Sequence, residues 1–415
     1  NATARTMNQV ARKPHSIWRI GRAKVKPSPP PPAAWLPDNG RMTHWIDTPE
    51  ALRARLAQPP AIIGLDTEFI RERTYWPQLA LVQIALGDSA EAASDGNILL
   101  VDPLLPGMCE ALVPLLADPA VLKVMHSASE DLVAFKHACG VLPSPLFDTQ
   151  VAAALAGVGG GMGYQKLVQA VTDVALEKGE TRSDWLRRPL SASQLDYAAD
   201  DVRHLHAMHR HLDARLEAQG RGAWLQEDCR RLLATVADDE GDPWPHLSLR
   251  SAQFLDRDAQ LRLSRLLRWR ESRARGSDRP RSWILDNELA VAIARRAPAD
   301  LPALQSLLEA TPKSPRNLAE AIFHALSTPL ADEADAPLAR GDDRDKKQLR
   351  AMQDAVAAAA AGLGLPEGLL ASRRLLEALQ DGGGWNGALA GWRRALLEPK
   401  LGPLLAVGNP NAASV

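Results

Sequence analysis

The sequence predicts an α/β domain with a mixed β-sheet, followed by two all-helical regions. Three strand-like apolar runs follow one another without a helical pattern between them, at residues 61–66, 79–86 and 97–102. From residue 107 onward, helical and strand-like patterns alternate, which is typical of layered α/β folds. Beyond about residue 220 no strand-like run follows, and the spacing of apolar residues is that of amphipathic helices.

Local signals place the elements of the α/β domain in order. Thr48 and Pro49 begin a short helix, with a capping side chain followed by proline at the first helical position. The strand at 121–125 leads into a helix from Ser127, where 127–130 has the spacing of a capping box. A second capping box at 191–194 begins one long helix, which is expected to run to about residue 217.

Composition narrows the class of protein. The chain has 415 residues, of which 46% are hydrophobic, enough for two to four domains with their own cores. No apolar run approaches the 18 residues that a membrane span needs, so no membrane contact is expected. The three cysteines form no CxxC pair, which argues against a disulfide framework or a zinc site and favours the reducing cytoplasm.

Charge divides the chain into segments. Residues 1–41 hold 8 Lys and Arg against 1 Asp and a proline run, and are predicted to be a disordered extension. Residues 42–219 hold 14 Lys and Arg against 23 Asp and Glu, a net charge of −9, and 248–322 hold 14 against 9, a net charge of +5. An acidic part suits cations and a basic part suits a polyanion.

The chain is predicted to divide into the α/β domain and two helical units joined by linkers. The α/β domain is expected at 42–219, a linker at 220–247, helical units at 248–326 and 346–404 with a linker at 327–345 between them, and a tail at 405–415.

Two acids stand at the end of the first strand-like run. Asp66 and Glu68 are two residues apart, and a strand projects such residues on one face. Two adjacent negative charges near a core are unfavourable unless a cation neutralises them. Carboxylate oxygens suit Mg²⁺ or Mn²⁺, so the pair predicts half of a metal site. The alternative is that the two acids simply end a strand.

Two further segments supply candidates, and each has a structural alternative. Asp131 falls in the first turn of a predicted helix, where an acid also stabilises the helix dipole. Tyr197 and Asp201 are four residues apart and share a helix face, but they could equally be a core aromatic and a solvated charge.

Taken together, these acids resemble the DEDD exonuclease superfamily, in its tyrosine branch, and most closely the ribonuclease D family. The matching motifs are LDTEF at 65–69, PQLALVQ at 77–83, HSASED at 126–131, FDTQ at 147–150, SDWLRRPL at 183–190 and YAADDV at 197–202. The resemblance covers about 42–217 and implies an RNase H-like catalytic domain.

The resemblance implies a role for each acid. Asp66, Glu68 and Asp201 would bind one Mg²⁺ or Mn²⁺, and Asp66 would bridge to a second ion supported by Asp131. Tyr197 would orient the attacking water, since its ordinary pKa of about 10 makes it a poor base at pH 7. Contacts to the substrate are expected from four further residues, Phe69, His126, Trp185 and Arg188; core packing is the alternative for Phe69, and a structural role is the alternative for His126.

The helical regions resemble HRDC domains, with the clearer match at 248–326 and a more divergent one at 346–404. The first contains a basic segment whose arginines are expected to contact RNA phosphates, namely Arg268, Arg273 and Arg275. The alternative for these arginines is an ordinary solvated helix face.

The expected function is that of a 3′–5′ exoribonuclease that depends on two divalent ions, Mg²⁺ or Mn²⁺. It would release nucleoside 5′-monophosphates and trim 3′ ends of structured RNA such as tRNA precursors. The expected partner is RNA with a free 3′ end, bound by a monomer without an organic cofactor. The alternatives are a DNA 3′–5′ exonuclease of the same superfamily and an inactive RNA-binding scaffold.

Overall fold

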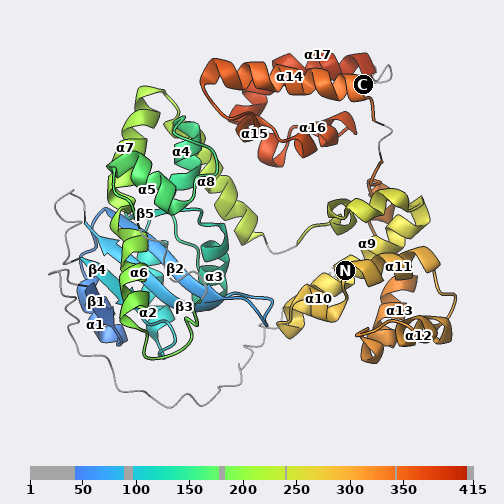
Figure 1. The fold of residues 1–415 in the computed structure, drawn as a ribbon, viewed down its shortest axis with the longest axis horizontal. Coiled ribbons are helices and arrows are strands. Elements are labelled where there is room, and N and C mark those ends of the chain that lie inside the picture. The colour runs from blue at the N-terminus through green and yellow to red at the C-terminus, as the bar shows by residue number, and fades with distance from the viewer. Residues whose placement is uncertain (1–42, 88–96, 177–182, 239–240, 342–343, 409–415) are drawn as a thin grey trace, which may run out of the picture.

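The computed structural model describes residues 43–87, 97–176, 183–238, 241–341 and 344–408, so the extension predicted at 1–41 and most of the tail predicted at 405–415 lie outside the described residues. Three bodies follow one another along the chain: a sheet domain, a middle helical unit and a C-terminal helical unit (Figure 1). No helix in the described part of the chain is long and apolar enough to cross a lipid bilayer.

A single six-stranded mixed sheet forms the centre of the first domain, as predicted. Its strand order is β1-β4-β3-β2-β5-β6. Strand β3 is antiparallel to its neighbours β2 and β4, whereas β1 pairs with β4, β5 with β2, and β6 with β5, all in parallel. The strands are β1 (Thr43–Ile46), β2 (Ile62–Ile70), β3 (Gln78–Leu86), β4 (Ile98–Val101), β5 (Leu122–Met125) and β6 (Leu146–Asp148).

Helices cover the sheet and bury its apolar side chains. Helix α6 packs on β2, β3 and β4, α7 on β2 and β5, and α3 on β2 and β3. Gly64 in β2 allows the close approach of α7, because an added Cβ would lie 3.1 Å from Cβ of Leu205. The helices of this part are α1 (Pro49–Arg55), α2 (Met108–Ala117), α3 (Ser129–Cys139), α4 (Thr149–Leu155), α5 (Tyr164–Thr172), α6 (Ala192–Arg203), α7 (Leu205–Ala218) and α8 (Gly222–Ala237).

The structure contains one of the two predicted capping boxes, and it divides the predicted long helix in two. The capping box at Ser191 is present. The box at 127–130 is not: Ser127 is left-handed with a φ of 57°, and α3 begins at Ser129 without a side-chain cap. The long helix predicted from 191 to 217 is interrupted at His204, whose backbone N–H donates to the Tyr164 hydroxyl instead of continuing a helical ladder.

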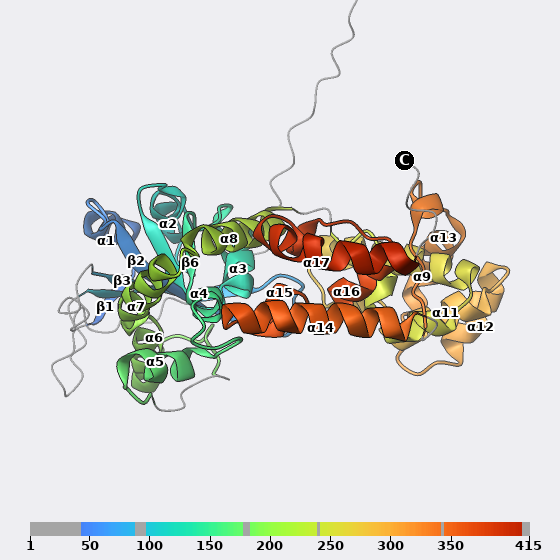
Figure 2. The same cartoon turned by 90° about the horizontal axis from the view of Figure 1, so that it is seen from above.

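Residues 220–247 are not a simple linker, which corrects the prediction. They contain α8, which packs on α3, α4 and β6. The C-terminal unit docks on this helix, since Trp224 and Trp392 stack with ring centroids 4.5 Å apart, and Asp228 accepts two hydrogen bonds from Arg393 at 2.7 and 2.8 Å. The C-terminal unit consists of α14 (Lys346–Leu363), α15 (Glu367–Leu370), α16 (Arg373–Gln380) and α17 (Trp392–Gly408) (Figure 2). Its apolar core is continuous with that of the sheet domain.

Asp228→Ala is expected to detach the C-terminal unit from α8. Asp228 and Arg393 are both more than nine-tenths buried, and truncating one partner leaves the other charge buried without compensation. Removing one partner of such a pair destabilises by about 3–5 kcal/mol. Urea unfolding should measure the loss. The matched control is Asp354→Ala in α14, whose ion pair with Arg350 is exposed and should contribute little. Equal midpoints for the two variants would contradict this role of Asp228.

The middle unit has its own apolar core and one contact region with the sheet domain. Its helices are α9 (Arg257–Ser277), α10 (Arg281–Ile284), α11 (Asn287–Arg296), α12 (Leu301–Glu309) and α13 (Ala319–Ser327). In the contact region Asp278 accepts hydrogen bonds from the backbone N–H groups of Tyr75 and Trp76, both at 3.0 Å. Tyr75 also packs against Ala274 and Ile284. The turn between β2 and β3 thus fixes the middle unit to the domain that carries the predicted site.

Candidate active site

The two acids of β2 lie where the edge of that strand opens. Strand β5 pairs with β2 only as far as Gly64, which faces Val124. Asp66 and Glu68 therefore stand beyond the end of β5, at the edge that faces the start of α3. Both are partly exposed. A β-bulge follows directly, between Glu68 and Phe69, and a bulge increases the local twist and changes the direction of nearby side chains.

Asp131 is brought to this edge by the turn that joins β5 to α3. The Asp148 carboxylate accepts hydrogen bonds from the N–H groups of Ser127 and Ala128, at 3.2 and 2.9 Å, and so shapes the turn. Asp131 itself is 8% exposed and accepts a hydrogen bond from the Thr67 hydroxyl. The third acid is therefore tied directly to the strand that carries the first two.

Helix α6 supplies the last two predicted residues. Tyr197 and Asp201 lie one turn apart on α6, and the tyrosine hydroxyl is hydrogen-bonded to the Asp201 carboxylate. The Trp185 ring packs beside Tyr197, with centroids 6.1 Å apart. Since α6 packs across β2, both residues face the strand acids.

The electrostatics show that the four carboxylates share one environment. The pKa of Asp66 is well above its ordinary value, first because of burial and then because three charges surround it, those of Asp131, Asp201 and Glu68. Burial, and then the charges of Asp201 and Asp131, raise the pKa of Glu68 to about 8. Burial is also the main cause that raises the pKa of Asp131 and of Asp201 to about 7.

Burial and the Asp201 charge raise the pKa of Tyr197 above its ordinary value. The tyrosine therefore stays protonated at neutral pH and can donate a hydrogen bond.

This donor set fits a hard divalent cation. It consists of oxygen atoms alone, and their mutual repulsion is relieved when positive charge enters. Within the described ranges no three acidic, histidine or cysteine side chains already surround a common point closely enough to hold an ion. The acids that would take up the cation are Asp66, Glu68, Asp131 and Asp201.

The raised pKa values predict how stability depends on pH. Carboxyl groups with folded pKa values of about 7 to 8 keep protons that the unfolded chain loses near pH 4. The metal-free protein should therefore lose stability as the pH rises from about 5 to 8.5, and Mg²⁺ should restore more of it at pH 8.5 than at pH 5.5.

Thermal midpoints with EDTA and with Mg²⁺ at both pH values would measure this. Asp201→Asn serves as the comparison, because it removes one of the four charges and should flatten the dependence. A metal-free midpoint that falls across this range no more steeply than that of Asp201→Asn would contradict the prediction.

Two of the residues expected to contact substrate are structural. Trp185 is only 3% exposed. All five N–H donors of Arg188 are bonded within the protein: to Asp102 through Nε and Nη2 at 2.8 and 2.7 Å, to the carbonyl of Ala80 at 2.6 Å, and to the carbonyls of Trp185 and Arg187. No donor remains for a phosphate, so the expectation for Arg188 is wrong. Burial of the Trp185 ring likewise contradicts a substrate contact.

Phe69 and His126 have intermediate positions. Phe69 is partly buried against the core, one residue after Glu68. His126 directly follows β5, and its Nδ1 lies 2.9 Å from the Thr149 hydroxyl while its ring meets Tyr164 edge-on at 5.6 Å. Burial lowers the pKa of His126. A substrate contact by either residue stays a prediction.

Three residues that support the site were not identified from the sequence. They are Thr67, Asp148 and Tyr164. The Tyr164 hydroxyl donates to the carbonyl of Asp200 at 2.8 Å and holds the C-terminal end of α6, next to Asp201. A polar residue between two candidate acids could have pointed to Thr67. The partners of the other two lie 20 or more residues away in the sequence.

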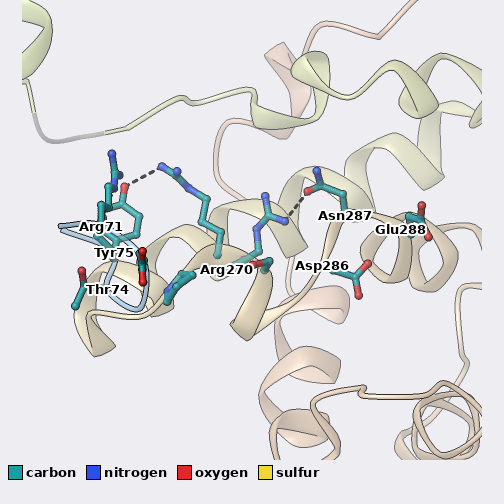
Figure 3. A pocket seen from close by; sticks show the side chains of 11 residues that line it. Arg71, Thr74, Tyr75, Arg270, Asp286, Asn287 and Glu288 are labelled. Atoms are coloured by element: carbon teal, nitrogen blue, oxygen red, sulfur yellow. Dashed lines mark hydrogen bonds between the residues drawn. The ribbon is translucent and has the colours of Figure 1, made fainter. Parts of the chain in front are cut away.

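A cavity of about 770 Å³ lies between the sheet domain and the middle unit, a few residues beyond Glu68 along the chain (Figure 3). Arg71 and Tyr75 line it from the sheet domain, and Arg270 and Asn287 from the middle unit. Arg71 is held by Glu130 at 2.6 Å and by the carbonyl of Tyr75 at 2.8 Å. Acids also line the cavity, among them Asp286 and Glu288, so its charge is mixed.

The three arginines expected to bind RNA differ in their surroundings. Arg268 makes two hydrogen bonds to Asp332, at 2.7 and 2.8 Å, in the segment predicted as a linker. Arg275 pairs with Glu271 at 2.9 Å and lies over the Tyr75 ring. Only Arg273 is exposed with no ion pair among the described residues. The basic segment is therefore largely used to assemble the protein, and RNA contact by these arginines stays a prediction.

Comparison with known proteins agrees with this arrangement. A family model for 3′–5′ exonucleases matches residues 43–217, which include all four acids and Tyr197. An HRDC domain model matches residues 260–326, within the middle unit.

Whole proteins match as well. Ribonuclease D of Xanthomonas oryzae pv. oryzae is 63% identical over 366 residues, 88% of this chain and 99% of that protein. Ribonuclease D of Pseudomonas paraeruginosa is 38% identical over 366 residues, 84% of this chain and 94% of that protein. The crystal structure of Escherichia coli RNase D, an exoribonuclease involved in structured RNA processing, has a TM-score of 0.74 at 29% identity and covers 88% of this chain and 99% of that one. The chain belongs to the ribonuclease D family of 3′–5′ exoribonucleases.

Proposed function

We propose that the four-carboxylate centre binds two divalent cations, Mg²⁺ or Mn²⁺, and removes nucleotides one at a time from a free RNA 3′ end as 5′-monophosphates. The observation that carries this proposal is the convergence of Asp66, Glu68, Asp131 and Asp201, from three separate elements, at one partly exposed edge of β2. The charges of the other acids raise the pKa values of Asp66, Glu68 and Asp201, which makes this arrangement costly without a bound cation.

The protein's own groups divide the work. Asp66, Glu68 and Asp201 would hold one ion, and Asp66 with Asp131 the other. When bound, the two cations would lower the pKa of a water molecule. They would also supply positive charge near the attacking and leaving oxygens. Thr67 keeps Asp131 in place through its hydroxyl. Tyr197, protonated at neutral pH, orients the attacking water by a hydrogen bond and does not act as a free base.

The proposed substrate is structured RNA such as tRNA precursors. The name of the Escherichia coli relative, an exoribonuclease involved in structured RNA processing, supports this class of substrate. The mixed-charge cavity beside the site, with Arg71 and Arg270 on its wall, offers room for a polyanion near the β2 edge.

We also propose that 346–404 is a second, divergent HRDC-like unit. The order of its helices supports this. In the middle unit a long helix of 21 residues is followed by a short one of 4 and then one of 10; the C-terminal unit has 18, 4 and 8 residues in the same order.

A cytoplasmic monomer is the proposed physical form. The cysteines Cys109, Cys139 and Cys229 are all unpaired, as is usual in a reducing compartment. The large apolar side chains exposed in the described ranges come from different elements, which supports a monomer: Leu104, Val174, Phe254 and Trp283.

A nuclease assay tests the proposed function. A 3′-extended RNA and a DNA of the same sequence would each be incubated with the full chain in Mg²⁺, in Mn²⁺ and in EDTA, and products followed over time. Stepwise shortening of RNA with release of 5′-monophosphates, lost in EDTA, is expected. Equal or faster shortening of the DNA would favour the alternative of a DNA exonuclease, and binding without shortening would favour a scaffold.

A further inference from the structure

A second cavity, of about 350 Å³, lies in the middle unit and differs in charge from the one beside the active site. Three cationic side chains line it, Arg273, Arg279 and Lys313, and no acid does. All three are exposed, and none has an ion pair within the described ranges. Unpaired cations around one cavity are the usual basis for binding an anion.

An exposed tryptophan stands at the same cavity. Trp283 is 58% exposed, which is unusual for so large an apolar side chain. Its backbone is nevertheless held in place, since its N–H donates to the carbonyl of Pro280 at 2.9 Å and Leu285 continues the turn by bonding to Arg281 at 3.0 Å. The indole is therefore presented to solvent by a fixed turn.

The cavity lies beside the contact with the catalytic domain. Ile284 and Leu318 line it, and both also pack in the apolar cluster that includes Tyr75. Tyr75 is seven residues after Glu68, so the chain between them spans at most about 25 Å. At about 3.4 Å for each stacked nucleotide, this distance corresponds to roughly seven nucleotides of one strand. An RNA whose 3′ end reaches the four acids could therefore reach Trp283 with an upstream nucleotide.

We infer that this cavity is a stacking subsite for an unpaired upstream nucleotide of the RNA substrate. The base lies against the Trp283 indole, and the adjoining phosphates meet Arg273, Arg279 and Lys313. An exposed aromatic ring beside cations is the combination that binds single strands without regard to sequence. A duplex keeps its bases stacked on one another, so it would use the cations but not the indole. The inference rests on the proposed function, because it assumes that the 3′ end lies at the carboxylate centre.

RNA binding by the full chain in EDTA tests the inference without cleavage. Unstructured RNAs of 4 and 16 nucleotides and a 16-base-pair RNA duplex would be titrated against wild type, Trp283→Ala and Trp283→Phe. Trp283→Ala should weaken binding of the 16-nucleotide strand by roughly 5- to 100-fold, whereas Trp283→Phe should retain most of it. Binding of the 4-nucleotide strand should not change, because it is too short to span the distance. The triple variant Arg273→Ala, Arg279→Ala, Lys313→Ala should reduce the slope of log affinity against log salt by roughly 2.

Matched controls come from the same unit. Phe254→Ala removes another exposed aromatic, 72% exposed, and the double variant Arg295→Ala, Arg296→Ala removes two exposed cations at the end of α11. Neither control should weaken binding of the 16-nucleotide single strand as Trp283→Ala does. Equal affinities of wild type and Trp283→Ala for the 16-nucleotide strand would overturn the inference, as would an equal loss for duplex and single strand.

The two proposals fail in different ways. If the chain shortened no RNA in Mg²⁺, the proposed function would fail whatever the binding results. If Trp283→Ala bound and shortened the 4- and 16-nucleotide RNAs with the affinities and rates of the wild type, the stacking-subsite inference would be wrong while the exonuclease proposal stood.

Discussion

Asp66→Asn and Asp201→Asn are each expected to reduce RNA cleavage by on the order of a thousandfold or more while the protein remains folded. Either change replaces a charged oxygen by a neutral amide at the centre of the four carboxylates. A divalent ion in such a site contributes several kcal/mol to the transition state, and each 1.36 kcal/mol corresponds to a factor of ten.

The same variants should not lose stability in the absence of metal. Asp66 is surrounded by Asp131, Asp201 and Glu68, whose charges oppose its ionisation. Asparagine has nearly the same shape and removes that repulsion, so the thermal midpoint in EDTA should stay the same or rise. A loss of activity that accompanies a higher midpoint would separate a functional acid from a structural one.

Cleavage of a short RNA at saturating Mg²⁺ and the thermal midpoint in EDTA are the two measurements. Asp200→Asn is the matched control. Asp200 is the neighbour of Asp201 but points to Arg203, with which it forms an ion pair at 2.7 Å, so its loss should leave most of the activity. Turnover near the wild-type rate in Asp66→Asn or Asp201→Asn would contradict the assignment of the site.

The sequence predicted the parts of the site that local spacing determines. The two-residue step from Asp66 to Glu68 and the four-residue step from Tyr197 to Asp201 each identify one face of one element. Strand order, the open edge of β2 and the bulge at Glu68 depend on pairing between segments distant in sequence. For that reason the hydrogen-bond partners of Thr67 and Asp148, which lie across the fold, could be recognised only in the structure.

The same reasoning explains the two main errors. The sequence predicts a linker at 220–247, but Asp228 of α8 is satisfied by Trp392 and Arg393, more than 160 residues away. Arg188 is expected from the sequence to contact substrate. Its five donors are instead taken up by Asp102 and by backbone carbonyls, which no local pattern reveals. A polar residue's role depends on its partners, and partners are set by the fold.

Tyr197→Phe should lower kcat by roughly 100-fold or more and leave KM nearly unchanged. The substitution keeps the ring that packs beside Trp185 and removes only the hydroxyl that meets Asp201. Losing a group that positions the attacking water affects the transition state and not substrate binding, and positioned proton donors and acceptors contribute about 100- to 10,000-fold.

The matched control is Tyr75→Phe, since Tyr75 is another of the three tyrosines of the chain. Tyr75→Phe also removes one hydroxyl, but that hydroxyl bonds to Glu271 and Arg281 at the contact with the middle unit. On a short RNA it should leave kcat close to the wild-type value.

Rates with a short RNA as a function of Mg²⁺ would complete the test of Tyr197→Phe. The Mg²⁺ concentration for half activation should change little, because the carboxylates that bind the ions remain. A rise in KM with kcat unchanged would make Tyr197 a binding residue. A large rise in the Mg²⁺ requirement would mean that the hydroxyl acts by holding Asp201 for the ions and not by orienting water.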